Sequence, residues 1–273
     1  MRGLDTPVGG GVRAGRAVNL VVTGSGGALR IPNATCACAV CREARVKGAP
    51  YRRLGQSLYS RDMGALFDAP EDINEAINAR AITRVDTIFF THWHPDHTAG
   101  LRIVEALHAA SPDRAVEIFL PPGGLDFSIN GNSLLDWFVR SRYCVCRELI
   151  APVERGGVTV TPVTLDNGFV YAFALDSGNT RVVHAPCHAK YLPDHPALRD
   201  ADALILGMGD PRRAEPGKTS FADNLRAIET LRPKRAILTH IEEEWKMNHD
   251  ELISFVADHP SIEIAFDGME IIT

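Results

Sequence analysis

The chain has 273 residues, of which 45% are hydrophobic and 23% are charged, and its net charge at pH 7 is -5. This composition is typical of a globular protein with a full core, and it argues against a globally basic nucleic-acid binder. No apolar run reaches the length of a membrane span, and residues 1–16 lack the apolar segment of a secretory signal. We therefore expect a cytoplasmic protein with a disordered lead-in over 1–16 and one domain over 17–273.

The first half of the chain is predicted to alternate strands with helices. Runs of β-branched and aromatic residues indicate strands, whereas acidic residues at the start of a segment indicate helices. Strands are expected over residues 18–23, 57–60, 65–67, 87–91 and 116–120. Helices are expected over residues 71–80, 98–110 and 125–140. The Gly-rich turn at 24–27 is interpreted as a tight strand exit rather than as a phosphate-binding loop.

The second half continues this alternation. Residues 148–185 are rich in strand-forming residues and alternate with period two at 158–161. Further strands are expected over residues 203–206, 235–239 and 262–266, and helices over residues 220–231 and 249–257. Strand clusters interleaved with helices indicate a layered α/β fold.

A His-rich turn, with the sequence THWHPDH over residues 91–97, follows the expected strand at 87–91. Imidazole nitrogens and carboxylate oxygens are the usual ligands of zinc, and they also suit manganese. Residues two apart point the same way on an extended strand exit, so His92 and His94 can share one ion. Asp96 and His97 lie on the next turn and can reach a second ion roughly 3.5–4 Å away. A chance cluster is disfavoured because these ligands follow a buried strand in this order.

The pattern HxHxDH after an apolar strand resembles the signature of the metallo-β-lactamase superfamily. This resemblance implies a four-layer αββα sandwich that carries metal ions at one edge of two sheets. It also implies that His240, which follows the apolar strand expected over residues 235–239, is the final ligand of the metal centre.

Further segments are similar to the phosphodiesterases of the carbon–phosphorus lyase pathway. They are the turn TGSGGA at 23–28, the CxCxxC loop at 36–41, YRR at 51–53, LTHI at 238–241 and FDGMEI at 266–271. Those enzymes use paired metal ions to open the cyclic phosphate of 5-phosphoribosyl 1,2-cyclic phosphate. The resemblance therefore implies a small phosphate ester as substrate.

Two metal ligands of that family are replaced in this chain. Asn167 stands where the family has a histidine, and Asp166 can substitute if the register shifts by one. Cys187 stands where the family has a bridging aspartate, and a thiolate is a good metal ligand. His184 and His188, which flank Cys187, are further candidates. The predicted metal ligands of the centre are His92, His94, Asp96, His97, Cys187 and His240.

The segment GMGDPR at 207–212 replaces a stretch in which the family has a histidine for proton transfer or substrate contact. We predict Asp96 and Asp210 as catalytic acid–base residues, and Arg212 and Arg213 as phosphate-binding residues. The alternative is an exposed loop whose charges are ordinary.

A cysteine loop supplies three thiols within six residues, which indicates a structural zinc site that lacks one ligand. The thiols are those of Cys36, Cys38 and Cys41. The resemblance places the fourth ligand at Glu243, with Glu242 and Glu244 as alternatives, and a metal-free loop is the competing interpretation. Cys144 and Cys146 are expected to be buried packing residues.

These features predict a metal-dependent hydrolase, and specifically a phosphodiesterase that acts on a small phosphate ester, cyclic esters included. A metal-bound hydroxide is the expected nucleophile, with zinc or manganese in one or two sites. A lactone or thioester hydrolase and a catalytically degenerate relative are the alternatives. The acidic net charge gives no support for a nuclease, the lack of a long apolar run gives none for a membrane partner, and a homodimer is left open.

Overall fold

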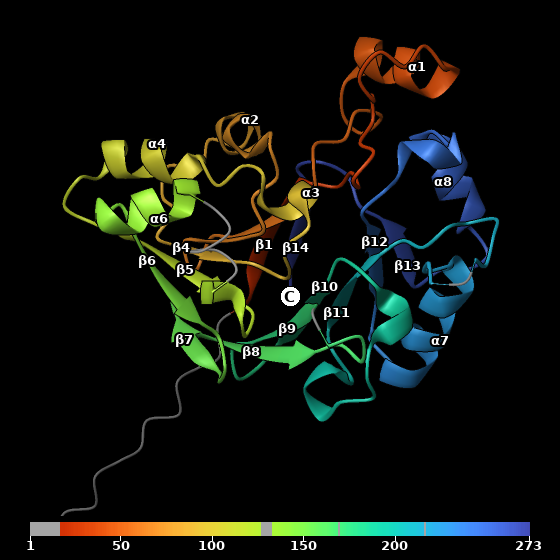
Figure 1. Ribbon diagram of the computed structural model, residues 1–273. Helices are drawn as coiled ribbons and strands as arrows, with labels where there is room; N and C mark the ends of the chain where they lie inside the picture. The colour runs from red at the N-terminus through yellow and green to blue at the C-terminus, as the bar shows by residue number, and fades with distance from the viewer. Residues whose placement is uncertain (1–16, 127–132, 169, 216) are drawn as a thin grey trace, which may run out of the picture.

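Two mixed β-sheets lie face to face at the centre of the molecule, and helices cover their outer surfaces (Figure 1). The structure is a computed structural model that describes residues 17–126, 133–168, 170–215 and 217–273. Within these residues each sheet has seven strands. The first sheet runs in the order β14 (Glu270–Ile272), β1 (Asn19–Gly24), β2 (Ser57–Ser60), β3 (Ala65–Phe67), β4 (Thr87–Phe89), β5 (Val116–Leu120) and β6 (Cys144–Glu148). The second runs in the order β13 (Ile262–Ile264), β12 (Ala236–Thr239), β11 (Ala203–Gly207), β10 (Arg181–Ala185), β9 (Tyr171–Asp176), β8 (Val158–Thr164) and β7 (Val153–Arg155).

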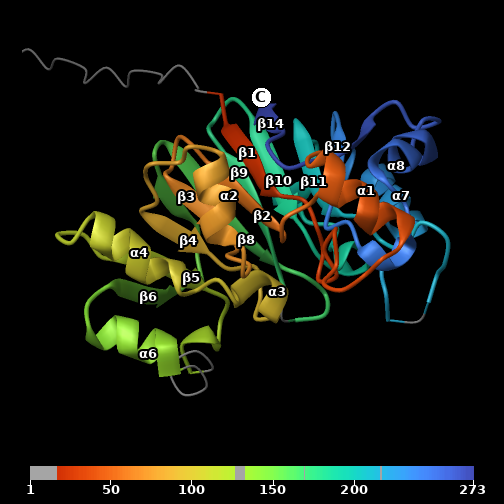
Figure 2. The same cartoon turned by 90° about the horizontal axis from the view of Figure 1, so that it is seen from above.

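The helices form two outer layers, as the view from above shows (Figure 2). The first sheet is covered by α2 (Ile73–Ala79), α4 (Ile103–Ala110) and α6 (Ser133–Arg140). The second is covered by α7 (Phe221–Leu231) and α8 (His249–Phe255). A further helix, α1 (Ala39–Lys47), contains the last cysteine of the loop and lies above the sheets in Figure 1, and its buried residues Val40 and Ala44 belong to the apolar cluster of the second sheet. The predicted four-layer αββα sandwich is therefore confirmed.

Three apolar clusters hold these layers together. The cluster between the sheets contains Phe67, Phe89 and Phe173, whose rings lie within 5.1–5.9 Å of one another and are nearly inaccessible to solvent. Each such ring contributes about 1.5–3 kcal/mol through burial of apolar surface. The other two clusters lie between each sheet and its helices. This packing fixes the strand ends, and the strand ends carry the site.

One predicted helix differs in the structure. Residues 98–110 do not form one helix, because the chain is divided into α3 (Pro95–Thr98) and α4. The backbone of Ala69 takes both hydrogen bonds that a continuous helix would use: its N–H donates to the His97 carbonyl (2.8 Å), and its carbonyl accepts from the Gly100 N–H (2.8 Å). A tertiary contact therefore ends α3 directly after the His-rich turn.

Some elements were not predicted, and some predictions cannot be compared. Helix α1 and the strands β6 and β14 were missed. The lead-in predicted over 1–16, and residues 127–132 of the helix predicted over 125–140, lie outside the described residues.

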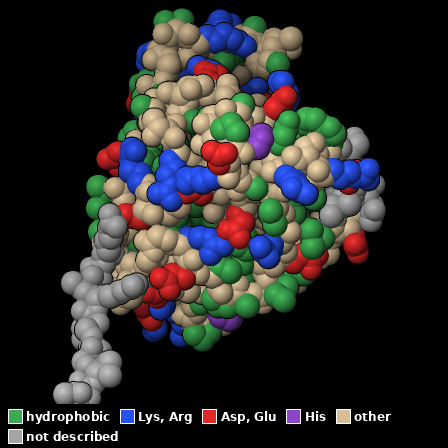
Figure 3. All heavy atoms as spheres, turned by 90° about the vertical axis from the view of Figure 1, so that its left-hand side faces the viewer, with side chains coloured by type: hydrophobic (Ala, Val, Ile, Leu, Met, Phe, Trp, Pro, Cys, Tyr) green, Lys and Arg blue, Asp and Glu red, His purple; other side chains and the backbone are tan. Residues whose placement is uncertain are grey.

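Charges of both signs are interspersed on the face that carries β6 and α6 (Figure 3). In this part of the molecule Glu117 pairs with Arg155 (2.5 Å) and Arg147 (3.3 Å), so cations are neutralised locally. None of the described helices combines the length and the apolar character needed to cross a membrane.

Candidate metal centre

The His-rich turn is held in place by a buried carboxylate that the sequence analysis missed. Asp68 follows β3, has a left-handed backbone (φ 64°) and is inaccessible to solvent. Its carboxylate accepts hydrogen bonds from the Thr91 N–H (2.8 Å) and the His97 Nδ1–H (2.7 Å), at the two ends of the turn. The second bond orients the ring of His97 so that its Nε2 atom faces away from Asp68 and can bind a metal ion. Carboxylates often orient metal-binding histidines in this way. An aspartate directly after a buried strand was the available signal.

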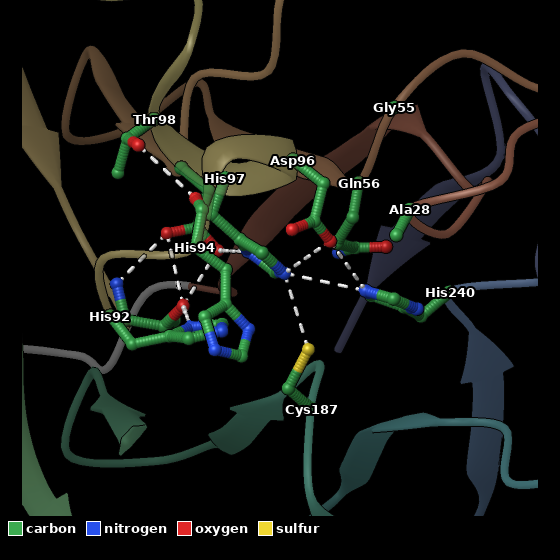
Figure 4. A network of polar contacts seen from close by, with 12 residues as sticks. Ala28, Gly55, Gln56, His92, His94, Asp96, His97, Thr98, Cys187 and His240 are labelled. Atoms are coloured by element: carbon green, nitrogen blue, oxygen red, sulfur yellow. Dashed lines mark hydrogen bonds and ion pairs between the residues drawn. The ribbon is translucent and has the colours of Figure 1, made fainter. Parts of the chain in front are cut away.

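Ligand atoms from both sheets converge on His97 (Figure 4). Its Nε2 atom lies 3.2 Å from the Cys187 Sγ atom, 3.3 Å from Asp96 Oδ2 and 3.3 Å from His240 Nε2. Cys187 and His240 follow β10 and β12, whose carboxyl ends meet at one edge of the second sheet because β10, β11 and β12 are parallel. Strand ends thus gather residues that are far apart in the sequence.

Three overlapping sets of side chains place their ligand atoms within 4.8 Å of one another. The sets are His92 with His97 and Cys187, His92 with His94 and His188, and Asp96 with His97 and His240. All six predicted ligands therefore lie in one cluster, and His188 joins them. Asp166 belongs to none of the ligand sets found among the described residues; it is exposed, and its N–H donates to the Tyr191 carbonyl (2.9 Å).

The charges in the cluster suit a divalent cation. Burial alone would raise the pKa of Cys187, but the positive charges of His240 and His97 hold it well below the ordinary value. Burial likewise opposes ionisation of Asp96, yet hydrogen bonds from His240 and His97 hold its pKa well below the usual range. The centre thus combines an anionic thiolate and an anionic carboxylate with imidazoles. A bound divalent ion would supply the positive charge that two imidazolium protons otherwise provide.

Burial lowers the pKa of both His94 and His188, so these imidazoles are neutral near pH 7 and keep a lone pair for a metal ion. The cluster therefore fits one or two divalent transition ions by its donor types.

His240 also has an outer-shell carboxylate. Its Nδ1 atom lies 3.2 Å from Glu242 Oε1, and the Glu242 carboxylate accepts the N–H groups of Ala28 (3.0 Å) and Leu29 (2.7 Å). A Cβ atom on Gly27 would lie 2.1 Å from Glu242 Oε1 and 2.7 Å from His240 Nδ1. The Gly-rich turn is therefore needed for close approach of the backbone to the final ligand.

A cavity of about 260 Å³ opens over the cluster. Asp210 and Trp245 line it, and among the described residues Lys218 is its one lysine or arginine. The predicted phosphate-binding residues Arg212 and Arg213 are exposed and line a neighbouring hollow that shares Asp210 and Lys218. Their backbone N–H groups donate to Asp210 Oδ1 at 2.8 and 3.0 Å, which fixes that carboxylate. Lys218, which the sequence analysis missed, lies in a Gly-Lys-Thr segment just before α7.

The cysteine loop gathers its thiols on one carboxylate oxygen. The Sγ atoms lie 3.1–3.3 Å from Glu243 Oε1 and belong to Cys36, Cys38 and Cys41. Burial opposes ionisation of Glu243, but Lys246 and the thiols lower its pKa to about 2, so the fourth position is anionic. Three sulfurs and one oxygen around one point match the donor number of a structural zinc site. Cys144 and Cys146 lie on β6, and the described ligand groups do not include them.

Two facing sheets with a ligand cluster at one edge form the architecture of a metal-dependent hydrolase. The sequence agrees with this class, because the family model described as a beta-lactamase superfamily domain matches residues 65–241. The chain belongs to this metallo-β-lactamase superfamily.

Solved structures share the fold. A diphosphatase of the PhnP family superposes with a TM-score of 0.77 and 22% identity, covering 94% of this chain and 97% of the other. Zn²⁺-bound PqqB from Methylobacterium extorquens has a TM-score of 0.73 and 20% identity, covering 93% and 99%. The short form of human tRNase Z has a TM-score of 0.63 and 18% identity, covering 93% and 98%. No curated protein has a sequence that matches this chain significantly.

Proposed function

We propose that the chain is a phosphodiesterase that hydrolyses a small phosphate ester, cyclic esters included. The observation that carries this proposal is the pairing, across one cavity of about 260 Å³, of a metal-ligand cluster with a lysine and a fixed carboxylate. Phosphoryl transfer needs positive charge at the phosphate oxygens and a group that handles the proton of the leaving oxygen. The segments shared with the carbon–phosphorus lyase phosphodiesterases, and the fold shared with a PhnP-family diphosphatase, support the same class of substrate.

The ligands would divide between two ions, and the two anionic ligands would bind the same one. Asp96, His97, Cys187 and His240 would hold one ion, and His92 and His94 would hold the other. Bound metal supplies Lewis acidity and lowers the pKa of water, which is the chemistry that phosphodiester hydrolysis requires. Because soft thiolate ligands favour zinc, Cys187 makes zinc the expected ion in preference to manganese.

The residues around the cavity have separate roles. Lys218 would bind the non-bridging phosphate oxygens, and Asp210 would transfer a proton at the leaving oxygen. Asp96 stays ionised because its pKa is held low, so it would orient the attacking water as a hydrogen-bond acceptor. Arg212 and Arg213, on the neighbouring hollow, would attract an anionic substrate toward the cavity.

The cysteine loop would bind a structural zinc ion through Cys36, Cys38, Cys41 and Glu243. This site would anchor the loop and α1 to the segment that follows His240, since Glu243 lies only three residues beyond that ligand. Its role would therefore be stability rather than chemistry.

The activity is tested with zinc-loaded and manganese-loaded protein on an aryl phosphodiester, a lactone and a thioester. We expect hydrolysis of the diester, with zinc the more tightly held ion. His240→Ala should remove both the hydrolysis and the metal at the centre, because it takes one of few ligands. Turnover of the lactone or the thioester without turnover of the diester would refute the proposal.

A further inference from the structure

The turn after β10 has a backbone that fixes the direction of one additional imidazole. His188 has a left-handed backbone (φ 58°, ψ 37°), which a residue with a Cβ atom rarely adopts. Its carbonyl accepts a hydrogen bond from the Tyr191 N–H (2.8 Å), which holds the chain that follows the residue. A conformation of this kind persists where the surroundings require it.

The neighbouring strand fits closely against this turn. A Cβ atom on Gly207, the last residue of β11, would lie 2.1 Å from the Pro186 carbonyl oxygen and 3.3 Å from the Cys187 Cα atom. Glycine at this position therefore allows β11 to support the turn that carries both Cys187 and His188.

The ring of His188 is directed at the first two histidines of the His-rich turn. Its centroid lies 6.0 Å from that of His92 and 6.0 Å from that of His94. The ligand nitrogens of the three residues lie within 4.8 Å of one another. Zinc–nitrogen bonds of about 2.0–2.1 Å would bring them to roughly 3.4 Å from one another in a tetrahedral site.

We propose that His188 is the third ligand of the first metal ion, together with His92 and His94. In the resembled family a histidine at the position of Asn167 binds the first ion, and His188 replaces it in this chain. This inference rests on the proposed function and extends it, because it gives the first ion three neutral imidazoles and leaves a fourth position open for water or substrate. The second ion keeps the anionic ligands Asp96 and Cys187.

The test is cobalt binding to the full chain. His188→Asn removes the imidazole while keeping a residue that tolerates the left-handed backbone. We expect this variant to bind one of its cobalt ions more weakly than the wild type. The loss of affinity should be at least the 10- to 100-fold that loss of an outer-shell partner causes. The part of the sulfur-to-metal absorption band that depends on Cys187, measured as the part that Cys187→Ser removes, should remain, because the lost ion has no sulfur ligand. His195→Asn is the matched control, since His195 is an exposed histidine of the same segment and is in none of the described ligand sets. It should bind cobalt as the wild type does.

The inference is overturned if His188→Asn binds cobalt with wild-type stoichiometry and affinity. It is also overturned if the part of the band that depends on Cys187 disappears together with the lost ion, because the first ion would then not be separate from Cys187. Melting temperatures of both variants check that the fold is intact. Failure of the proposed function is a different result: wild-type protein with full metal occupancy would leave the phosphodiester uncleaved.

Discussion

His184 should make the protein sensitive to mild acid. It lies on β10 within the inter-sheet layer, is inaccessible to solvent and packs against Phe67, with ring centroids 5.6 Å apart. Within the described residues, neither ring nitrogen has a hydrogen-bond partner. Burial lowers the pKa of His184 to about 4, against about 6.5 for an exposed histidine.

The sign of the effect follows from which state binds the proton. Between about pH 6.5 and pH 4 the unfolded chain protonates this histidine and the folded chain does not, so stability falls as the pH falls through this window. The full difference of about 2.5 pKa units corresponds to about 3 kcal/mol. At about pH 5 the loss attributable to His184 is about 2 kcal/mol.

The measurement is urea unfolding of wild type and His184→Leu at about pH 7.5 and pH 5. EDTA is present in every sample, so that metal release adds no pH dependence of its own. Leucine is similar in volume to histidine and does not titrate, so the variant should lose about 2 kcal/mol less than the wild type on acidification. His195→Asn, which removes an exposed histidine, should behave as the wild type does. An equal loss in His184→Leu and in wild type would show that His184 does not titrate as described.

Three further changes test the supports of the site. Asp68→Asn should weaken metal binding by about 10- to 100-fold, because it disturbs the hydrogen bond that orients His97. Equilibrium dialysis measures the metal affinity, and a wild-type value would contradict this prediction. Cys38→Ser should release one zinc equivalent and lower the melting temperature while the metal centre keeps its ions; unchanged zinc content would exclude a metal at the loop. Lys218→Met should lower kcat/KM for a phosphodiester by about 10- to 100-fold, because a charged hydrogen bond to phosphate contributes about 1.5–3 kcal/mol. Lys234→Met, at a surface ion pair with Asp202, is its control, and equal effects of both changes would argue against phosphate binding by Lys218.

The parts of the site that follow apolar strands were predictable from the sequence. The His-rich turn and His240 each come directly after a buried strand, and a strand exit determines both the position and the direction of a side chain. The cysteine loop was recognisable from its spacing, whereas Glu243 came from the family resemblance. The structure places all of these residues in two compact clusters.

Other features depend on tertiary contacts that no local pattern records. Asp68 acquires its role only because β3 and β4 are neighbours in the sheet, and Lys218 lines the cavity from the loop before α7. Helix α3 ends early because the backbone of Ala69 takes its hydrogen bonds. Strand β6 has the short sequence CVCRE, which ends in two charged residues, and it lies at the edge of its sheet, so its sequence carries little strand signal.

The charges of the ligands suggest how a two-ion centre of this composition would divide its work. Asp96 and Cys187 are both anionic, so together they neutralise the charge of one divalent ion. An ion on His92, His94 and His188 would have only neutral ligands and would keep its full positive charge. His94, His188 and Lys218 all line the cavity, so this ion and the Lys218 ammonium would both present positive charge to it. Asp96 and Asp210, together with glutamates, also line the cavity and would repel a phosphate in the absence of metal. Binding of an anionic ester should therefore depend on the all-imidazole ion, while the thiolate-bound ion would stay in place as a tightly held partner.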